Sequence, residues 1–476
     1  MNLQLHLCAD YTKFAHNIIL IDNKTDLGKL GLTPAITAEA QSFFKEKVNH
    51  IFQQLFEGKS ISIVKVEENK LGHKTLEAAR KAGHAINKFL NGKKIKTASV
   101  YSSIDNTITA AFAEGVVLSN YEFLKYKTKN KTEKSLSALH IDQRNADKNT
   151  LAQITNTATA VFFSRTLVNE PLSYLTATQL SKEISVAGKK YGFKVTVFDK
   201  KKIEQLKMGG LLAVNKGSVD PPTFTILEYK PAKYKNKKPI VLVGKGVVYD
   251  TGGLSLKPTP NSMDMMKCDM AGAATVAGTF VSAALNKLPI HLIGLIPATD
   301  NRPGGNAYVP GDVITMMSGL NVEMLNADAE GRMILADALH YAKQYKPELV
   351  FDFATLTGAA KAAAGSVVTP IMGTASDAAK GLLAASGMAV YERLLELPLH
   401  DEYGDMIKSE IADIKNIGGP EAGAITAGKF LEHFTDYPWM HFDIAGTAYL
   451  THEDAYRGKY GTGVGVRLLT HFLKNY

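Results

Sequence analysis

Acidic and basic side chains gather in three short segments between residues 240 and 332, where glycine, alanine and apolar residues surround them. A charge in such surroundings needs a partner, because burying it alone costs a great deal of free energy. For any one acid, a turn or a helix cap would be explanation enough, but three such segments close together favour one site. The charged positions are Asp250, Asp269, Asp328, Glu330, Lys245, Lys257 and Arg332.

Four carboxylates in one site would repel one another, and two divalent cations would cancel their charge. Carboxylate oxygens suit Mg²⁺ and Mn²⁺, and Zn²⁺ also uses them. Two ions about 3.5–4 Å apart can share a bridging water or hydroxide, which is a natural nucleophile. Lys257 and Arg332 would then face the negative charge that develops on a substrate oxygen.

The third segment, Asn326-Ala-Asp-Ala-Glu-Gly-Arg332, resembles the Asn-Thr-Asp-Ala-Glu-Gly-Arg motif of the leucyl aminopeptidase family, also called cytosol aminopeptidases. Asn416 and the segments 422–426 and 439–446 resemble this family too, and the likeness covers roughly residues 150–476. Ala327 stands where the family usually has Thr, which removes a hydroxyl beside two predicted metal ligands. Asp328 and Glu330 keep their spacing, so we expect metal binding to survive, with any effect of Ala327 falling on metal affinity or rate.

The resemblance implies a set of five metal ligands. Asp250 and Glu330 would bridge the two ions, Asp328 would bind one ion, and Lys245 and Asp269 would bind the other. The lysine ligand must be neutral, although the pKa of free lysine is about 10.4. A phosphate-binding lysine is the weaker alternative, because the glycines that flank it lack the P-loop spacing.

The same resemblance implies a metal-dependent hydrolase that removes the first residue of a peptide with a free amine. The amine would bind one ion, the scissile carbonyl would lie on the other, and the bridging water or hydroxide would attack. Lys257 would stabilise the oxyanion, and Arg332 would hold a bicarbonate ion that acts as the general base. The expected ions are Zn²⁺ or Mn²⁺, with Mg²⁺ and Co²⁺ as alternatives.

A largely apolar pocket for the first side chain is also implied by resemblance. It predicts leucine-like substrates with a broad profile, since one methylene changes discrimination by only about 1–3 kcal/mol. Ordinary core packing is the alternative for Met266. The predicted pocket residues are Met266, Thr355, Leu356, Gly358, Ala445 and Ala448.

At 476 residues the chain is long for one core, and we expect an α/β protein with two domains. Residues 1–150 alternate β-like and helical patterns and end in a polar linker, whereas residues 151–476 form the larger catalytic domain, with a central mixed sheet flanked by helices. Residues 240–243 predict a strand covered on both faces, which brings Lys245 and Asp250 to the sheet edge. In the smaller domain, Thr33 and Pro34 predict the start of a helix that continues to Phe56.

The formal net charge is +9, and most of the excess lies in residues 1–150. These lysines are scattered, which favours a solvated surface over a nucleic-acid site, although some bacterial relatives bind DNA. The two cysteines fit a reducing compartment, and the sequence has neither a signal pattern at its start nor an apolar run of membrane length. We therefore expect a cytoplasmic protein without a membrane partner and, by resemblance, a homohexamer.

Two other classes of function stay open at this level. Aspartate clusters with Mg²⁺ also occur in phosphatases and phosphotransferases, although no phosphate-binding loop supports that reading. The second alternative is a DNA-binding or scaffolding protein in which the peptidase fold is secondary.

Overall fold

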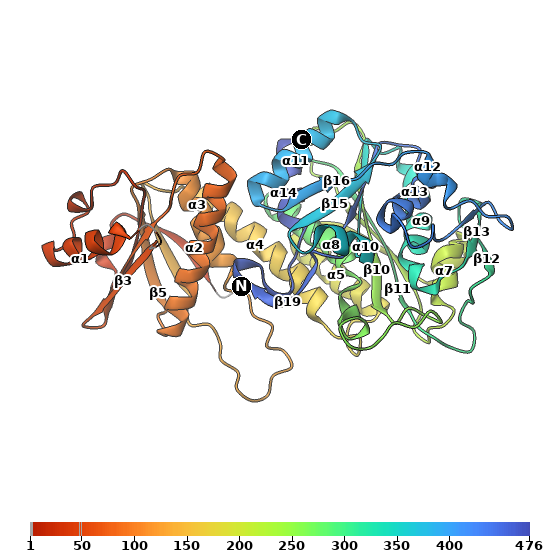
Figure 1. Cartoon of the computed structure of the whole chain (residues 1–476), viewed down its shortest axis with the longest axis horizontal. Helices are drawn as coiled ribbons and strands as arrows, with labels where there is room; N and C mark the ends of the chain where they lie inside the picture. The colour runs from red at the N-terminus through yellow and green to blue at the C-terminus, as the bar shows by residue number, and fades with distance from the viewer. Residues whose placement is uncertain (1–2, 47, 49) are drawn as a thin grey trace. The chain divides into compact units, whose positions relative to one another are not determined.

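Figure 1 shows the computed structural model, which describes residues 3–46, 48 and 50–476. The chain divides into two compact units, one formed by the residues up to Phe162 with 453–458, and the other by residues 163–452 with 459–476. This division falls inside the helix α4 (Lys148–Asn169). The domain boundary expected at residue 150 stays a prediction.

The first unit is built on a six-stranded sheet. Its neighbouring strands are parallel except at one edge, where β3 runs antiparallel to β4. The spatial order is β1 (Gln4–Cys8), β6 (Ala138–Asp142), β5 (Thr97–Ser102), β2 (His16–Ile21), β4 (Lys59–Lys65) and β3 (Ile51–Phe56).

Three further helices belong to this unit: α1 (Pro34–Lys45), α2 (Gly72–Gly92) and α3 (Asn106–Leu118). The helices α2 and α3 lie side by side (Figure 1) and approach very closely. A Cβ atom on Gly83 would lie 2.3 Å from the Phe112 carbonyl oxygen, and one on Gly115 would lie 2.1 Å from the Arg80 carbonyl oxygen. Both positions therefore require glycine.

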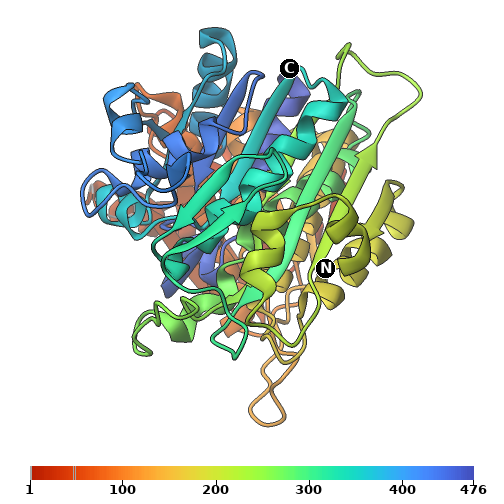
Figure 2. The ribbon, with the colours of Figure 1, turned by 90° about the vertical axis from the view of Figure 1, so that its right-hand side faces the viewer.

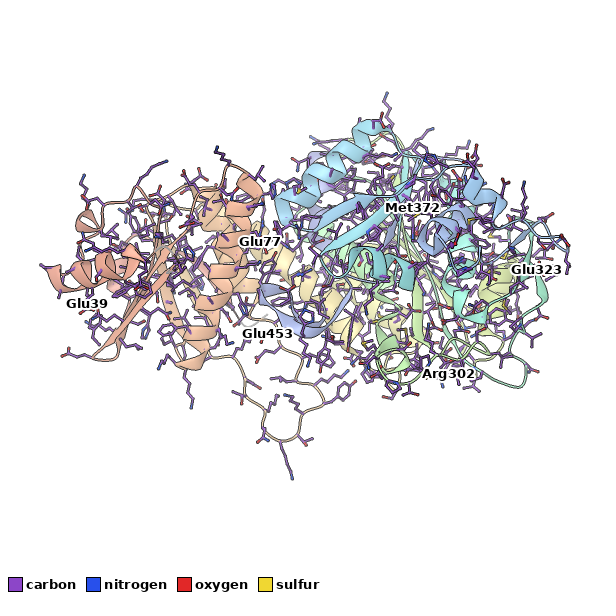
Figure 3. The ribbon with its side chains drawn as sticks, viewed as in Figure 1. Glu39, Glu77, Arg302, Glu323, Met372 and Glu453 are labelled. Atoms are coloured by element: carbon purple, nitrogen blue, oxygen red, sulfur yellow. The ribbon has the colours of Figure 1, made fainter. Side chains whose placement is uncertain are left out.

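Charged side chains meet at this helix contact, where Glu77 and Arg80 are buried and Glu114 is partly buried. We call these three residues the α2–α3 cluster. Arg80 Nε lies 2.6 Å from Glu114 Oε2, and Arg80 Nη1 lies 3.8 Å from Glu77 Oε2. The Tyr456 hydroxyl also donates to Glu77 Oε2, at 2.8 Å. Glu77 is labelled on α2 in Figure 3.

Two sequence-based predictions for this unit are wrong. The helix that begins at Pro34, capped by Thr33 as expected, ends at Lys45, and residues 51–56 form the strand β3 instead. That prediction also covered residues 47 and 49, which lie outside the described residues. The predicted linker contains the strand β6, which pairs with both β1 and β5. In each case long-range strand pairing outweighs the local pattern.

The second unit contains a nine-stranded mixed sheet. The predicted central strand is confirmed: β9 is fully buried and pairs in parallel with β14 and β11. In spatial order the strands are β16 (Arg393–Glu396), β15 (Val368–Gly373), β18 (Trp439–Asp443), β14 (Leu349–Ala354), β9 (Ile240–Gly244), β11 (Leu292–Asn301), β8 (Thr223–Tyr229) and β7 (Lys194–Phe198). A ninth strand, β10 (Gly246–Asp250), pairs with β11 beyond the end of β9.

Helices pack on both sides of this sheet (Figure 2). On one side lie α5 (Ala177–Tyr191), α8 (Ala271–Leu285) and α14 (Val466–Asn475), and on the other lie α7 (Gly209–Asn215), α9 (Glu330–Ala342) and α13 (Gly423–Glu432). In the described part of the chain, one stretch, residues 263–285, has the length and apolar composition of a membrane-crossing helix, and 89% of its apolar window is buried inside the protein. This stretch includes α8, which packs on the sheet.

The second unit has further helices and strands. They are α6 (Lys200–Gln205), α10 (Gly358–Ala364), α11 (Asp377–Val390), α12 (Glu402–Asp405), β12 (Asp312–Thr315), β13 (Asn321–Met324) and β17 (Ile414–Lys415). The strands β19 (Tyr449–Asp454) and β20 (Gly458–Gly461) form a small separate sheet.

Candidate functional site

The charged residues predicted from the three segments meet at one end of β9. Lys245 follows β9 directly, and Asp250 is the last residue of β10. Asp269 follows a short 3-10 helix, residues 263–268, just before α8. Asp328 lies in a second 3-10 turn, and Glu330 begins α9. Parallel strands and the starts of the following helices converge at such an edge, which is why distant residues can share a site there.

Two lysines lie among the four carboxylates. Lys245 Nζ is 2.7 Å from Asp269 Oδ2 and 2.9 Å from Glu330 Oε1. Lys257 Nζ is 2.9 Å from Asp250 Oδ2 and also pairs with Asp328. We call these six residues the site cluster. Four carboxylates against two ammonium groups leave an excess of negative charge.

Three of the carboxylates can reach a common ion. One oxygen each of Asp250, Asp328 and Glu330 lies within 4.8 Å of the others. Buried carboxylate oxygens that converge in this way are the donor set that divalent cations use in proteins. The geometry of this chain therefore fits a bound metal.

Burial and mutual repulsion disturb the ionisation of the cluster. Burial, together with the charges of Asp250 and Glu330, raises the pKa of Asp328 to about 7. Burial likewise raises the pKa of Asp250 and raises that of Asp269 well above its ordinary value. Burial acts in the same direction on Glu330, but Lys245 and Lys257 lower its pKa overall. Additional positive charge would stabilise the ionised carboxylates.

The backbone around Ala327 is held by three side chains that the sequence analysis did not single out. Asn301 Nδ2 donates to the Ala327 carbonyl at 2.9 Å and to Asp250 Oδ1 at 2.8 Å. The Tyr308 hydroxyl donates to the same carbonyl at 3.0 Å. The Ala327 amide donates to Ser255 Oγ at 3.0 Å. This loop between two predicted ligands is therefore fixed by contacts from other segments.

Asn416, which was identified from the sequence, holds the preceding residues. Its Oδ1 accepts from the Leu325 amide at 2.8 Å, and its Nδ2 donates to the Asn326 carbonyl at 2.8 Å. Arg332 Nη1 donates to the Asn416 carbonyl at 2.6 Å. Arg332 itself is buried and is not among the residues that line the described cavity beside the cluster. Burial lowers the pKa of its guanidinium to about 10.

The site cluster opens into a cavity of about 320 Å³. Five of the predicted substrate residues line it, namely Met266, Thr355, Leu356, Gly358 and Ala445. Ala448 is only 1% exposed and is not part of the lining. Residues not foreseen as pocket residues also contribute: Asn261, Ser262, Met265, Cys268, Ala329, Gly331, Thr357, Lys361 and Tyr449.

Comparison with known proteins shows that two parts of the chain match two domains of the same family. Residues 162–470 match the model of the cytosol aminopeptidase family, catalytic domain, and residues 67–130 match that of the cytosol aminopeptidase family, N-terminal domain. A probable cytosol aminopeptidase of Geobacter sulfurreducens is 44% identical over 423 residues, which are 87% of this chain and 84% of that protein. One of Chlorobaculum parvum is 54% identical over 316 residues, which are 66% of this chain and 62% of that protein.

Solved structures resemble the whole chain. A mutant of tomato leucine aminopeptidase has a TM-score of 0.88 and 25% identity, with 100% of this chain and 97% of that chain covered. The bottromycin maturation enzyme BotP in complex with Mn has a TM-score of 0.86 and 28% identity, with 97% of this chain and 99% of that chain covered.

Proposed function

Because this chain belongs to the cytosol aminopeptidase family of metal-dependent exopeptidases, we propose that it uses two divalent ions to remove the first residue from peptides with a free amine, with leucine-like residues preferred. The observation that carries the proposal is the site cluster, where four carboxylates exceed two lysines beside a cavity. Two divalent ions carry four positive charges, which equal the four negative charges of the ionised carboxylates. The Mn in the related structure supports Mn²⁺ as one candidate, next to Zn²⁺.

Asp250 and Glu330 would bridge the ions, Asp328 would bind one, and Lys245 and Asp269 the other. When bound, such ions polarise the scissile carbonyl and activate a water molecule. The convergence of oxygens from three of these residues within 4.8 Å supports the assignment. Asn301 orients Asp250 from behind through its 2.8 Å hydrogen bond.

Lys257 would hold its proton and face the substrate oxygen on which negative charge develops. Its ammonium lines the cavity next to two carboxylates, and their charges raise its pKa although burial lowers it. A charged donor preplaced in a partly buried site is the arrangement that stabilises an oxyanion. Arg332 is buried and does not line the cavity, and its role of holding a bicarbonate ion is a proposal that rests on the family.

Lys245 does not suit the phosphate-binding alternative. It is 2% exposed, and its Nζ is surrounded by Asp269, Glu330 and the Thr355 carbonyl. An anionic phosphate would meet those carboxylates and be repelled. A homohexamer and a cytoplasmic location remain proposals that rest on the family.

The test is a metal titration with two readouts. Metal-stripped protein should bind two Mn²⁺ or Zn²⁺ per chain by calorimetry and should then cleave leucine p-nitroanilide, but not its N-acetyl derivative. If the protein is fully active with one ion bound per chain, the proposal that it uses two ions is overturned. Equal cleavage of the acetylated substrate would overturn the requirement for a free amine.

A further inference from the structure

The cavity is lined by two chemically different groups of residues. One is the site cluster, and the other includes Met265, Met266, Leu356, Ala445 and Tyr449. On the proposed function, on which this inference rests, the substrate amine lies at the cluster. The first side chain then contacts the second group.

Lys361 adds a positive charge to that second group. It is the one charged lining residue outside the site cluster in the described cavity. A Cβ atom on Gly446 would lie 3.5 Å from the Lys361 Cα atom, so Lys361 lies beside the segment that carries Ala445. Its side chain is exposed, so the ammonium is accessible to a ligand.

Lys361 lies on a helix whose start is held in place by hydrogen bonds, while its ammonium group makes none among the described residues. It lies on α10, whose start is capped by Thr357 Oγ1 accepting from the Ala360 amide at 3.0 Å. The Thr357 hydroxyl in turn donates to buried Asp443 at 2.7 Å. Among the described residues, no hydrogen bond or ion pair involves Lys361 Nζ.

We propose that Lys361 determines specificity by binding the side-chain carboxylate of an acidic first residue, so that the enzyme accepts N-terminal glutamate besides leucine-like residues. A carboxylate at the end of the pocket would gain a charge-assisted hydrogen bond from the unpaired ammonium. The side-chain amide of an N-terminal glutamine has the same shape, but it would offer the ammonium only a neutral oxygen as acceptor. The Tyr449 hydroxyl, also in the lining, offers a second donor.

The test compares two isosteric substrates, glutamyl and glutaminyl p-nitroanilide. In the unmodified enzyme we expect kcat/KM to be about tenfold higher for the glutamyl substrate, at low salt, in line with a partly exposed charge pair. Lys361→Met should remove most of this ratio, and Lys361→Glu should invert it and favour arginyl over methionyl substrates. Lys216→Glu is the matched control, because Lys216 is exposed and does not line the cavity.

The outcomes separate this inference from the proposed function. If leucine p-nitroanilide is not cleaved by the unmodified enzyme, the proposed function fails. If it is cleaved, but the glutamyl-to-glutaminyl ratio is the same in the Lys361→Glu and Lys216→Glu enzymes, this inference is overturned. It is also overturned if Lys361→Glu leaves that ratio alone and changes only the ratio of Leu-Gly to Leu-Gly amide, because the lysine would then bind a peptide C-terminus. Leucine p-nitroanilide, whose side chain is uncharged, reports whether each variant retains an assembled site.

Discussion

Each unit of the molecule contains a cluster of charged side chains, and the two clusters differ in the balance of their charges. In the α2–α3 cluster, the carboxylates of Glu77 and Glu114 face Arg80, and Lys81 Nζ lies 3.9 Å from Glu77 Oε1. Two cations thus match two acids at a helix contact. In the site cluster, four carboxylates exceed two lysines beside a cavity. A balanced cluster serves the fold, whereas an unbalanced one beside a cavity indicates a place for added cations.

The sharpest test of this difference is Glu330→Gln. It removes one charge from the unbalanced cluster, so we expect kcat/KM to fall by about 10³-fold or more, because a bridging ligand is lost. The melting temperature of the metal-free protein should fall only slightly: Glu330 is stabilised by Lys245 and Lys257, but Lys245 keeps Asp269 as a partner when Glu330 loses its charge. Glu323→Gln is the control: Glu323, labelled in Figure 3, lies on β13 and does not line the cavity. A large loss of metal-free stability in Glu330→Gln would break the comparison.

Arg80→Met should have the opposite effect, with a large loss of stability and no loss of activity. It leaves buried Glu77 and partly buried Glu114 without the central cation, and breaking a buried ion pair costs about 3–5 kcal/mol of unfolding free energy. Activity per folded molecule should stay at the level of the unmodified enzyme. Urea unfolding and a kcat measurement on the same samples check both parts. A stability loss below about 1 kcal/mol would mean that this cluster does not support the fold.

The pH dependence of metal-free stability should report the unbalanced cluster. Burial raises the pKa of Asp328 to about 7, above the unfolded value of about 3.9. The folded chain therefore binds this proton more tightly. The resulting stability is fully present below about pH 4 and is lost as the pH rises through about 7. Asp328→Asn should flatten the melting temperature over this range, and an unchanged slope would contradict the assignment.

Asn301→Ala should have the smallest of these effects. It removes hydrogen bonds to Asp250 and to the Ala327 carbonyl without removing a charge. Loss of such an orienting contact typically weakens metal binding about 10–100-fold. Calorimetric titration with Mn²⁺ measures this directly. Asn286→Ala is the control, because that amide bonds Ser282 outside the cavity; equal affinities in the two variants would exclude an orienting role for Asn301.

The charged residues of the site could be predicted from the sequence because their setting is local. Asp328 and Glu330 are two positions apart at the start of a helix, and Lys245 and Asp250 follow an apolar run that had to be a buried strand. Asn301, Tyr308 and Ser255 could not be found in this way. They act on Ala327 across 26, 19 and 72 positions of the chain. Asn301 is the last residue of the strand β11 in the structure, but no local sequence pattern marked it as a site residue.

The fold also could be predicted where it depends on local patterns, but not where it depends on long-range contacts. The α/β class and the central strand depend on apolar patterns within a few residues, and both were predicted. The strand β3 was taken for helix because its side chains fit either pattern until it pairs with β4, with Ile51 opposite Val64. The strand β6 was hidden in a polar stretch and is defined only by its neighbours, β1 and β5.

The loop around Ala327 has a consequence for exchange with solvent. Its successive amides donate to side chains: Leu325 to Asn416, Ala327 to Ser255 and Asp328 to Asn326. Amide hydrogens held in this way exchange slowly with deuterium, because the loop must open first. Protection at these positions should therefore be present before any ion binds. Metal uptake would then proceed into a loop that is already ordered, with little further loss of conformational entropy.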